Sequence, residues 1–323
     1  MERGAIVLID QRKLPERTTL VRAATLEEQV EAIRTLAVRG APALGAFGAF
    51  SLALAIARGE DPESSRSLLL SSRPTAVDLG NCMEEVILAF ERGGAEAALG
   101  ASNTIFQRII EACRRIGEAG SPLIADGSRT MTHCNAGALA SLDWGTALSP
   151  IRLAARSGRR PFVWVSETRP LLQGARLTAW ELSQERIGYK VFSDAAAGHL
   201  MSRGSVDLVL VGADRVCRNG DVANKIGTYM KAVLAKEHTI PFYVAFPTTT
   251  LSPGTRSGDE VVIEERDGVE VLSLSGDRTT PESSEVVNPA FDITPERYIT
   301  GYITEDGVFS PKELRDRYFS ERQ

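Results

Sequence analysis

A thiol and a carboxyl group attract attention first, because each follows a short apolar run that is typical of a buried strand. Cys134 comes after TMTH, and Asp214 comes after VDLVLVGA. A carboxyl group at the mouth of an apolar strand loses hydration, which raises its pKa toward the range that suits proton transfer. A thiol, with an ordinary pKa of about 8.5, acts as a proton donor or nucleophile only where its surroundings tune it. Taken alone, Asp214 could instead cap a turn, and Cys134 could be an inert buried thiol.

Two arginines stand where helices are predicted to begin, a place that suits a phosphate. In the segment RGAP, Arg39 is followed by Gly40, Ala41 and a proline that fits the first helical turn. Free backbone N–H groups and a guanidinium would then point the same way. Arg73 repeats this pattern more weakly at a second predicted helix start. The alternative in both cases is an ordinary helix start with a solvated arginine.

The segment NGDVANKIG, residues 219–227, predicts a turn that opens a helix. The apolar face of this helix would hold Ile226, Tyr229, Met230, Val233 and Leu234. Asn224 and Lys225 would stand at its start, close in sequence to Asp214. There an amide and a positive charge could hold sugar hydroxyls or a phosphate, with a solvated lysine as the alternative.

The elements that must position these groups are those of an α/β protein. After Ser121, helical segments alternate with the apolar runs PFVWVSE, YKVFSD, VDLVLVGAD and PFYVAFP. Runs that are apolar on both faces predict a mainly parallel sheet covered on both sides. Ligands of such a sheet bind outside the carboxyl ends of its strands. The residues that this edge would gather are Cys134, Glu167, Thr168, Asp194, Asp214 and Thr248–Thr250.

The first third of the chain predicts helices. After a short extended opening, they cover residues 26–38, 77–90 and 95–116. Residues 40–57 contain no charge over 18 positions, but ten of these are Ala or Gly, so a helix packed tightly inside the protein fits better than a membrane span. We therefore expect a mainly helical N-terminal domain, residues 1–118, and an α/β domain, residues 119–323.

Composition narrows the classes of partner. Lys and Arg number 37 and Asp and Glu 42, without a basic block that could follow a nucleic-acid backbone. Three histidines give little support to a metal cluster. Neither a G-x-G-x-x-G after a strand nor a P-loop motif is present, so a dinucleotide or nucleoside triphosphate has no recognisable cradle. Four cysteines without a C-x-x-C pair, and no recognisable signal peptide, predict free thiols in a reducing cytoplasm.

Long motifs in the chain resemble those of the methylthioribose-1-phosphate isomerase family. The superfamily also includes regulatory subunits of initiation factor 2B and ribose-1,5-bisphosphate isomerase. The motifs include LIDQRKLP (8–15), VRGAPALG (38–45), RPTAVDL (73–79), THCNAGALA (132–140), ETRPLLQGARLTAWEL (167–182), GADRVCRNGDVANKIGTY (212–229) and NPAFDITP (288–295). They follow one another along nearly the whole chain.

The resemblance implies a role for nine residues. Cys134 and Asp214 would be the catalytic pair, and the sugar phosphate would be bound by Arg39, Gly40, Ala41, Arg73, Gln173, Asn224 and Lys225. It also implies a helical domain joined to a Rossmann-like domain, a homodimer, and no cofactor or metal.

The implied reaction is the isomerisation of 5-methylthioribose 1-phosphate to 5-methylthioribulose 1-phosphate, a step of methionine salvage. Two alternatives keep the reaction but change the group at C5, namely 5-deoxyribose 1-phosphate and ribose 1,5-bisphosphate. An alternative of another class is a non-catalytic, sugar-phosphate-binding regulatory protein like the initiation factor 2B subunits. The presence of both Cys134 and Asp214 in intact motifs favours the enzyme.

Overall fold

The computed structural model describes residues 4–73, 77–274 and 276–320. Within them, a seven-stranded sheet has the order β15-β14-β9-β6-β3-β4-β5. Its strands are β3 (Arg129–Thr132), β4 (Phe162–Ser166), β5 (Gly188–Phe192), β6 (Leu208–Val211), β9 (Phe242–Ala245), β14 (Gly301–Thr304) and β15 (Gly307–Phe309). All neighbours pair in parallel except β14 and β15. The predicted mainly parallel sheet is confirmed.

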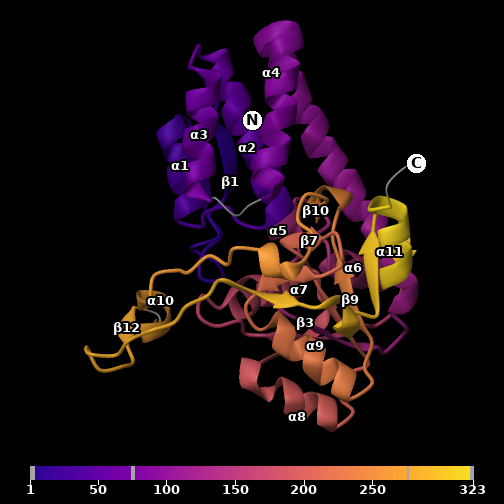
Figure 1. Cartoon of the computed structure of the whole chain (residues 1–323). Helices are drawn as coiled ribbons and strands as arrows, with labels where there is room; N and C mark the ends of the chain where they lie inside the picture. Colours follow the sequence, from indigo (N-terminus) through magenta and orange to yellow (C-terminus); the bar gives the residue numbers. More distant parts are fainter. Residues whose placement is uncertain (1–3, 74–76, 275, 321–323) are drawn as a thin grey trace.

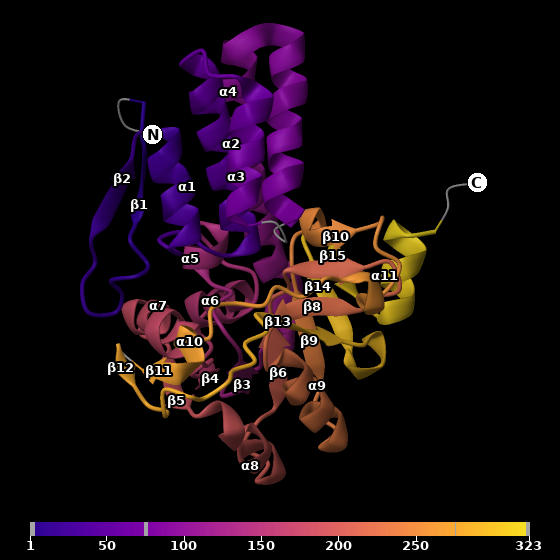
Figure 2. The same ribbon diagram turned by 60° about the vertical axis from the view of Figure 1, so that its left-hand side comes forward.

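Helices cover both faces of this sheet, which explains why four consecutive residues of β6 can all be apolar. Val209 and Val211 face a core shared with α8 (Ala197–Ser202), α9 (Thr228–Glu237) and α11 (Pro311–Tyr318). Leu208 and Leu210 face a second core, shared with α6 (Leu148–Arg156), α7 (Ala179–Gln184) and the end of α4 (Val77–Gly120). Figure 2 shows the strands between these two sets of helices.

The N-terminal part is a group of helices beside a hairpin (Figure 2). The hairpin is β1 (Ile6–Ile9) and β2 (Leu20–Ala23), and the helices are α1 (Leu26–Arg34), α2 (Ala41–Ala57), α3 (Pro62–Ser72) and α4 (Val77–Gly120). Helix α2 packs closely on α4: a Cβ at Gly48 would lie 2.2 Å from Leu79 Cδ1. This close approach explains the small residues of the uncharged segment. In the part of the chain that the structure describes, no helix is long and apolar enough to cross a bilayer.

Two helix boundaries differ from the prediction. Helix α1 ends at Arg34 rather than at residue 38, because Leu36 adopts a left-handed conformation with φ of 60°. Helix α4 continues through the expected gap, but Gly93 and Gly94 have non-helical dihedral angles and divide it into two segments. Residues 74–76, at the predicted start of this helix, lie outside the described residues. The division into domains 1–118 and 119–323 stays a proposal, and α4 crosses it.

A smaller sheet overturns the prediction of a helix start at Asn224 and Lys225. Its order is β10-β7-β8-β13, with β7 (Arg215–Cys217), β8 (Val222–Lys225), β10 (Leu251–Ser252) and β13 (Phe291–Thr294). Residues 222–225 are therefore a strand, because β7 and β13 pair with them on either side. Local spacing could not show the pairing with β13, since this strand lies more than 60 positions further along the chain.

The predicted apolar face of the following helix is also wrong. Helix α9 begins only at Thr228, after Gly227 turns the chain with φ of 97°. Tyr229 and Met230 are 39% exposed, whereas Lys231 is buried. A glycine turn between strand and helix sets which side of α9 faces the core, so the apolar spacing measured across that turn is misleading.

An arm projects from the C-terminal part, at the lower left of Figure 1. It contains α10 (Val269–Leu272), β11 (Ser273–Leu274) and β12 (Asp277–Arg278). The short helix α5 (Ala138–Ser141) lies between α2 and the main sheet and lines the site described below.

Candidate active site

The topology of the main sheet creates a crevice at the carboxyl ends of β3 and β6. These two strands are neighbours, and the chain continues from β3 to β4 and β5 on one side and from β6 to β9 and β14 on the other. Such a reversal of strand order leaves an opening in which ligands of α/β sheets bind. Cys134 follows β3 by two residues, and Asp214 follows β6 by three.

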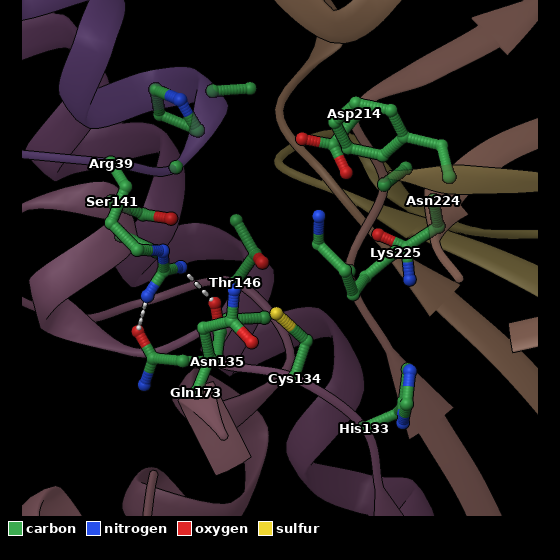
Figure 3. A pocket seen from close by; sticks show the side chains of 18 of the residues that line it. Arg39, His133, Cys134, Asn135, Ser141, Thr146, Gln173, Asp214, Asn224 and Lys225 are labelled. Carbon is green, nitrogen blue, oxygen red and sulfur yellow. Dashed lines mark hydrogen bonds between the residues drawn. The ribbon is translucent and has the colours of Figure 1, made fainter. Parts of the chain in front are cut away.

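Cys134 and Asp214 line one pocket at this crevice (Figure 3). The pocket encloses about 720 Å³, including the part that is open to solvent. The other seven residues expected at the site line it too: Arg39, Gly40, Ala41, Arg73, Gln173, Asn224 and Lys225. The structure therefore brings together residues that are up to 186 positions apart in the sequence, from Arg39 to Lys225.

The start of α2 forms one wall of the pocket. Gly40 is the N-cap residue of α2 and has φ of 94°. A Cβ on Gly40 would lie 2.4 Å from the carbonyl oxygen of Ala140, so glycine allows α2 to approach α5. Gly40, Ala41 and Pro42 line this wall together with Arg39. The positive end of a helix dipole beside a guanidinium is an arrangement that favours a phosphate.

The Arg39 side chain is buried, with 8% of the residue exposed, and hydrogen bonds hold it in place. Its two terminal nitrogens donate hydrogen bonds to the side-chain oxygen and to the carbonyl oxygen of Asn135, at 2.7 and 2.6 Å. The Asn135 amide in turn donates to Glu181 Oε1 at 2.8 Å, and Glu181 pairs with the buried Arg152 at 2.5 Å. This buried network sets the direction of the guanidinium. Our sequence analysis did not predict Asn135 at the site, although it stands next to Cys134.

Asp214 and Lys225 provide the charge on the opposite wall. Burial raises the pKa of Asp214, although Lys225 and two arginines of the pocket oppose the shift. Burial also lowers the pKa of Lys225. The Lys225 ammonium donates to the Ala290 carbonyl oxygen at 2.8 Å and lies 4.3 Å from the centre of the Phe291 ring. The pairing of β8 with β13 positions these two contacts.

Asn224 and Gln173 supply neutral polar groups. The Asn224 amide donates to Thr228 Oγ1 at 3.0 Å. Among the described residues, the buried Gln173 Oε1 has no hydrogen-bond partner. An unpaired buried acceptor of this kind costs free energy unless a ligand donates to it. Gln173 came only from the family resemblance, because no spacing rule singles it out.

Arg73 and Arg266 reach the pocket from separate segments. Arg73 Nε lies 3.7 Å from Glu264 Oε2, and Arg266 Nη1 lies 3.1 Å from Glu264 Oε1. Arg266 also pairs with Glu270 in the arm. The sequence analysis missed Arg266, which lies in none of the quoted motifs. It also missed Phe291, which lies in NPAFDITP but is an apolar residue that no spacing rule marks as a ligand contact.

His133 is a buried residue that contributes to the pocket wall. Its Nε2 lies 2.8 Å from the carbonyl oxygen of Ile226 and donates to it. Burial lowers the pKa of His133 to about 3, with the charge of Lys231 adding to the effect. The imidazole is therefore neutral at pH 7.

Several strand-end residues expected at the same edge do not line this pocket in the described structure. Thr250 Oγ1 donates to Asp78 at 3.4 Å, and the Thr248 amide donates to Glu305. The Asp194 carboxylate instead accepts hydrogen bonds from the backbone N–H groups of Thr168 and Arg169. Within residues 4–73, 77–274 and 276–320, no group of three or more His, Cys, Asp or Glu side chains is arranged to hold a metal ion.

Comparisons with known proteins agree on one family. Residues 37–311 match the initiation factor 2 subunit family. The methylthioribose-1-phosphate isomerase of Aquifex aeolicus is 47% identical over 96% of this chain and 68% of its own length. The crystal structure of 5-methylthioribose 1-phosphate isomerase from Pyrococcus horikoshii superposes with a TM-score of 0.90, at 38% identity, over 98% of this chain and 93% of that one.

A second solved structure is described as a translation initiation factor. It is eIF-2B subunit delta from A. fulgidus, which is 42% identical with a TM-score of 0.83, over 97% of each chain. The fold is therefore shared by a protein named as an isomerase and by one named as a translation initiation factor subunit.

Proposed function

The chain belongs to the methylthioribose-1-phosphate isomerases of the initiation factor 2 subunit family, and we propose that its pocket converts 5-methylthioribose 1-phosphate into 5-methylthioribulose 1-phosphate. The observation that carries this proposal is that Cys134 and Asp214 line the same pocket as Arg39 and the start of α2. An acid and a thiol thus stand beside a place for a phosphate. A protein that only binds the sugar phosphate has no need of this pair.

The substrate explains why an acid is needed. Because the phosphate occupies the anomeric oxygen, the ring cannot open through a free hemiacetal. The bond between C1 and the ring oxygen must break while the phosphate stays attached. Asp214, whose pKa is raised by burial, donates a proton to the departing ring oxygen. The positive charge that forms at C1 is stabilised by the oxygen atom that joins C1 to the phosphate.

The hydrogen on C2 must then reach C1. In one route Cys134, as the thiolate, takes it as a proton, the electron pair forms a C1–C2 double bond, and the thiol returns a proton to C1. In the other route the hydrogen moves directly as hydride. In both, the 2-hydroxyl loses its proton as the C2 ketone forms, and this proton restores Asp214. Deuterium from the solvent appears at C1 in the first route and is absent from C1 in the second.

The apolar part of the pocket supports a methylthio group at C5. Leu36, Leu171 and Phe291 line the pocket, and an uncharged thioether packs well against such a wall. A second phosphate would need further free cations, whereas Arg266 is already paired with two glutamates. We expect kcat/KM to be highest for the methylthio sugar when it is compared with 5-deoxyribose 1-phosphate and ribose 1,5-bisphosphate on one preparation.

The central experiment measures conversion of 5-methylthioribose 1-phosphate by the purified chain. We expect turnover by the wild type without any added protein. Cys134→Ser and Asp214→Asn should each lower kcat by about a thousandfold or more, because each removes a group that moves a proton in the reaction.

Cys217→Ser serves as the matched control, because Cys217 is a free thiol buried away from this pocket. Circular dichroism should show that all three variants fold. Near-normal turnover by either the Cys134 or the Asp214 variant would refute the assigned roles, and an inactive wild type would refute the proposed function.

Two further features are part of this proposal. A homodimer is expected from the family resemblance, and light scattering on the purified chain tests it. A cytoplasmic location agrees with four free cysteines. Fractionation of the producing cells tests the location.

A further inference from the structure

Cys134 has a backbone conformation that residues with side chains rarely adopt. Its φ is 59°, in the left-handed region. Two threonine hydroxyl groups hold its peptide from both sides. The Cys134 N–H donates to Thr168 Oγ1 at 2.9 Å, and the Cys134 carbonyl oxygen accepts from Thr178 Oγ1 at 2.7 Å. Both threonines are fully buried.

Thr168 is itself held in a strained conformation. Its φ is 67°, which is costly for a β-branched residue. The Thr168 N–H donates to Asp194 Oδ1 at 2.9 Å, and the next N–H, of Arg169, donates to Asp194 Oδ2 at 2.7 Å. A single carboxylate therefore anchors the turn from which the Thr168 hydroxyl reaches Cys134.

A buried cation accompanies this carboxylate. Lys231 is 0% exposed, and its ammonium lies 3.9 Å from Asp194 Oδ1. Burial works against the charge of Asp194, but a hydrogen bond from Ser166 and the charge of Lys231 lower its pKa below the usual range. Burying the charge of Lys231 is expensive, and in the described structure neither Lys231 nor the partly exposed Asp194 lines the pocket. The chemistry proposed above uses neither group directly.

We propose that Thr168 is a positioning residue for Cys134, and that the Asp194–Lys231 pair holds Thr168 in place. This proposal rests on the proposed function, because it assigns Thr168 a part in the isomerisation. The hydroxyl of Thr168 keeps the Cys134 amide in its left-handed conformation and thereby directs the thiol into the pocket. Without it, the peptide relaxes toward a common conformation and the sulfur moves. A displacement of about 1 Å at a reacting atom can cost a hundredfold in rate.

The experiment compares three variants of the full chain. Thr168→Val removes the hydroxyl at nearly constant volume, whereas Thr168→Ser keeps it. Thr130→Val is the matched control, because Thr130 is equally buried, lies in β3 just before Cys134, and its hydroxyl has no partner among the described residues. We expect Thr168→Val to lower kcat about 10- to 100-fold, with KM within about threefold of wild type. Thr168→Ser should restore most of kcat, and Thr130→Val should leave it unchanged.

A second measurement does not depend on the isomerisation. The rate at which iodoacetamide alkylates Cys134, followed by peptide mass spectrometry, reports the position and surroundings of the thiol. Cys82, Cys113 and Cys217 are buried and give a slow background. We expect at least a threefold change in this rate for Thr168→Val, and none for Thr130→Val. If Thr168→Val does not fold, Thr178→Val replaces it with the same expectation, since the Thr178 hydroxyl donates to the carbonyl oxygen of Cys134.

The outcomes separate the two proposals. A wild type without isomerase activity overturns the proposed function, yet a changed alkylation rate in Thr168→Val would still support the positioning of Cys134. An active Thr168→Val with unchanged kcat and an unchanged alkylation rate overturns the positioning role alone. Equal losses of kcat in Thr168→Val and Thr168→Ser would also overturn it, because the role is assigned to the hydroxyl.

Discussion

At the scale of single residues, the site depends on side chains whose direction is set by other buried groups. Arg39 is the clearest example, since both ends of its planar fork are used by one residue, Asn135. The N–H groups of the guanidinium that do not bind Asn135 are therefore already oriented before a phosphate arrives. Such preorganisation lowers the conformational entropy that binding would otherwise cost.

Arg39→Lys should raise KM for the sugar phosphate about tenfold, with a smaller effect on kcat. A lysine keeps the charge but cannot bind Asn135 at two points and present donors to a phosphate at the same time. Steady-state kinetics at fixed ionic strength measures both parameters. Arg160→Lys is the control, because the Arg160 side chain is 85% exposed. A KM within twofold of wild type for Arg39→Lys would mean that Arg39 does not grip the phosphate.

At the scale of elements, the start of α2 does two things at once. It lines the pocket with Gly40, Ala41 and Pro42, and it packs against α5 so closely that Gly40 has no room for a side chain. The stability of the helical part and the shape of the phosphate site thus depend on the same contact.

Gly40→Ala should lower the free energy of unfolding by about 3 kcal/mol, since a positive φ and a steric clash both act against the methyl group. Gly59→Ala is a matched control: Gly59 also has a positive φ, of 81°, but nothing lies within 4 Å of the added Cβ. That variant should lose only about 1 kcal/mol. Urea unfolding measures both. Equal losses in the two variants would show that the α2–α5 contact is not tight.

At the scale of the whole molecule, a buried carboxyl group joins the helical part to the sheet. Asp78, in the first turn of α4, accepts a hydrogen bond from Thr250, which directly precedes β10. Burial raises the pKa of Asp78 to about 6. Because this lies above the value of the unfolded chain, the folded state is favoured while Asp78 is protonated. That advantage is complete below pH 4 and is lost as the pH rises through about 6.

Asp78→Asn should therefore stabilise the protein at pH 8 and hardly change it near pH 4. The expected gain at pH 8 is about 2 to 3 kcal/mol in the free energy of unfolding, measured by denaturant titration at several pH values. Asp126→Asn should show the opposite sign: Arg160 lowers the pKa of Asp126 to about 2, so its charged form favours folding at pH 8. A stability difference for Asp78→Asn that does not vary with pH would contradict this account.

The sequence by itself determined the local elements and the chemical groups that end them. The apolar run of β6 and the small-residue segment of α2 indicated a sheet covered on both faces and a closely packed helix, because burial on both sides leaves a composition that is visible locally. Cys134 and Asp214 were found as strand-end residues for the same reason. Gln173 came only from the resemblance, since nothing in its own surroundings in the sequence marks it.

The tertiary structure alone decided which of these groups meet. That β3 and β6 are neighbours, so that Cys134 and Asp214 share a crevice, follows from a strand order that no local pattern records. The strand at residues 222–225 is held by its pairing with β13, and Arg266 reaches the pocket because its segment forms backbone hydrogen bonds with residues 288–290. Hydrogen bonds between distant segments stabilise each of these features. A periodic pattern reports only what neighbouring residues bury, and it contains no information about such partners.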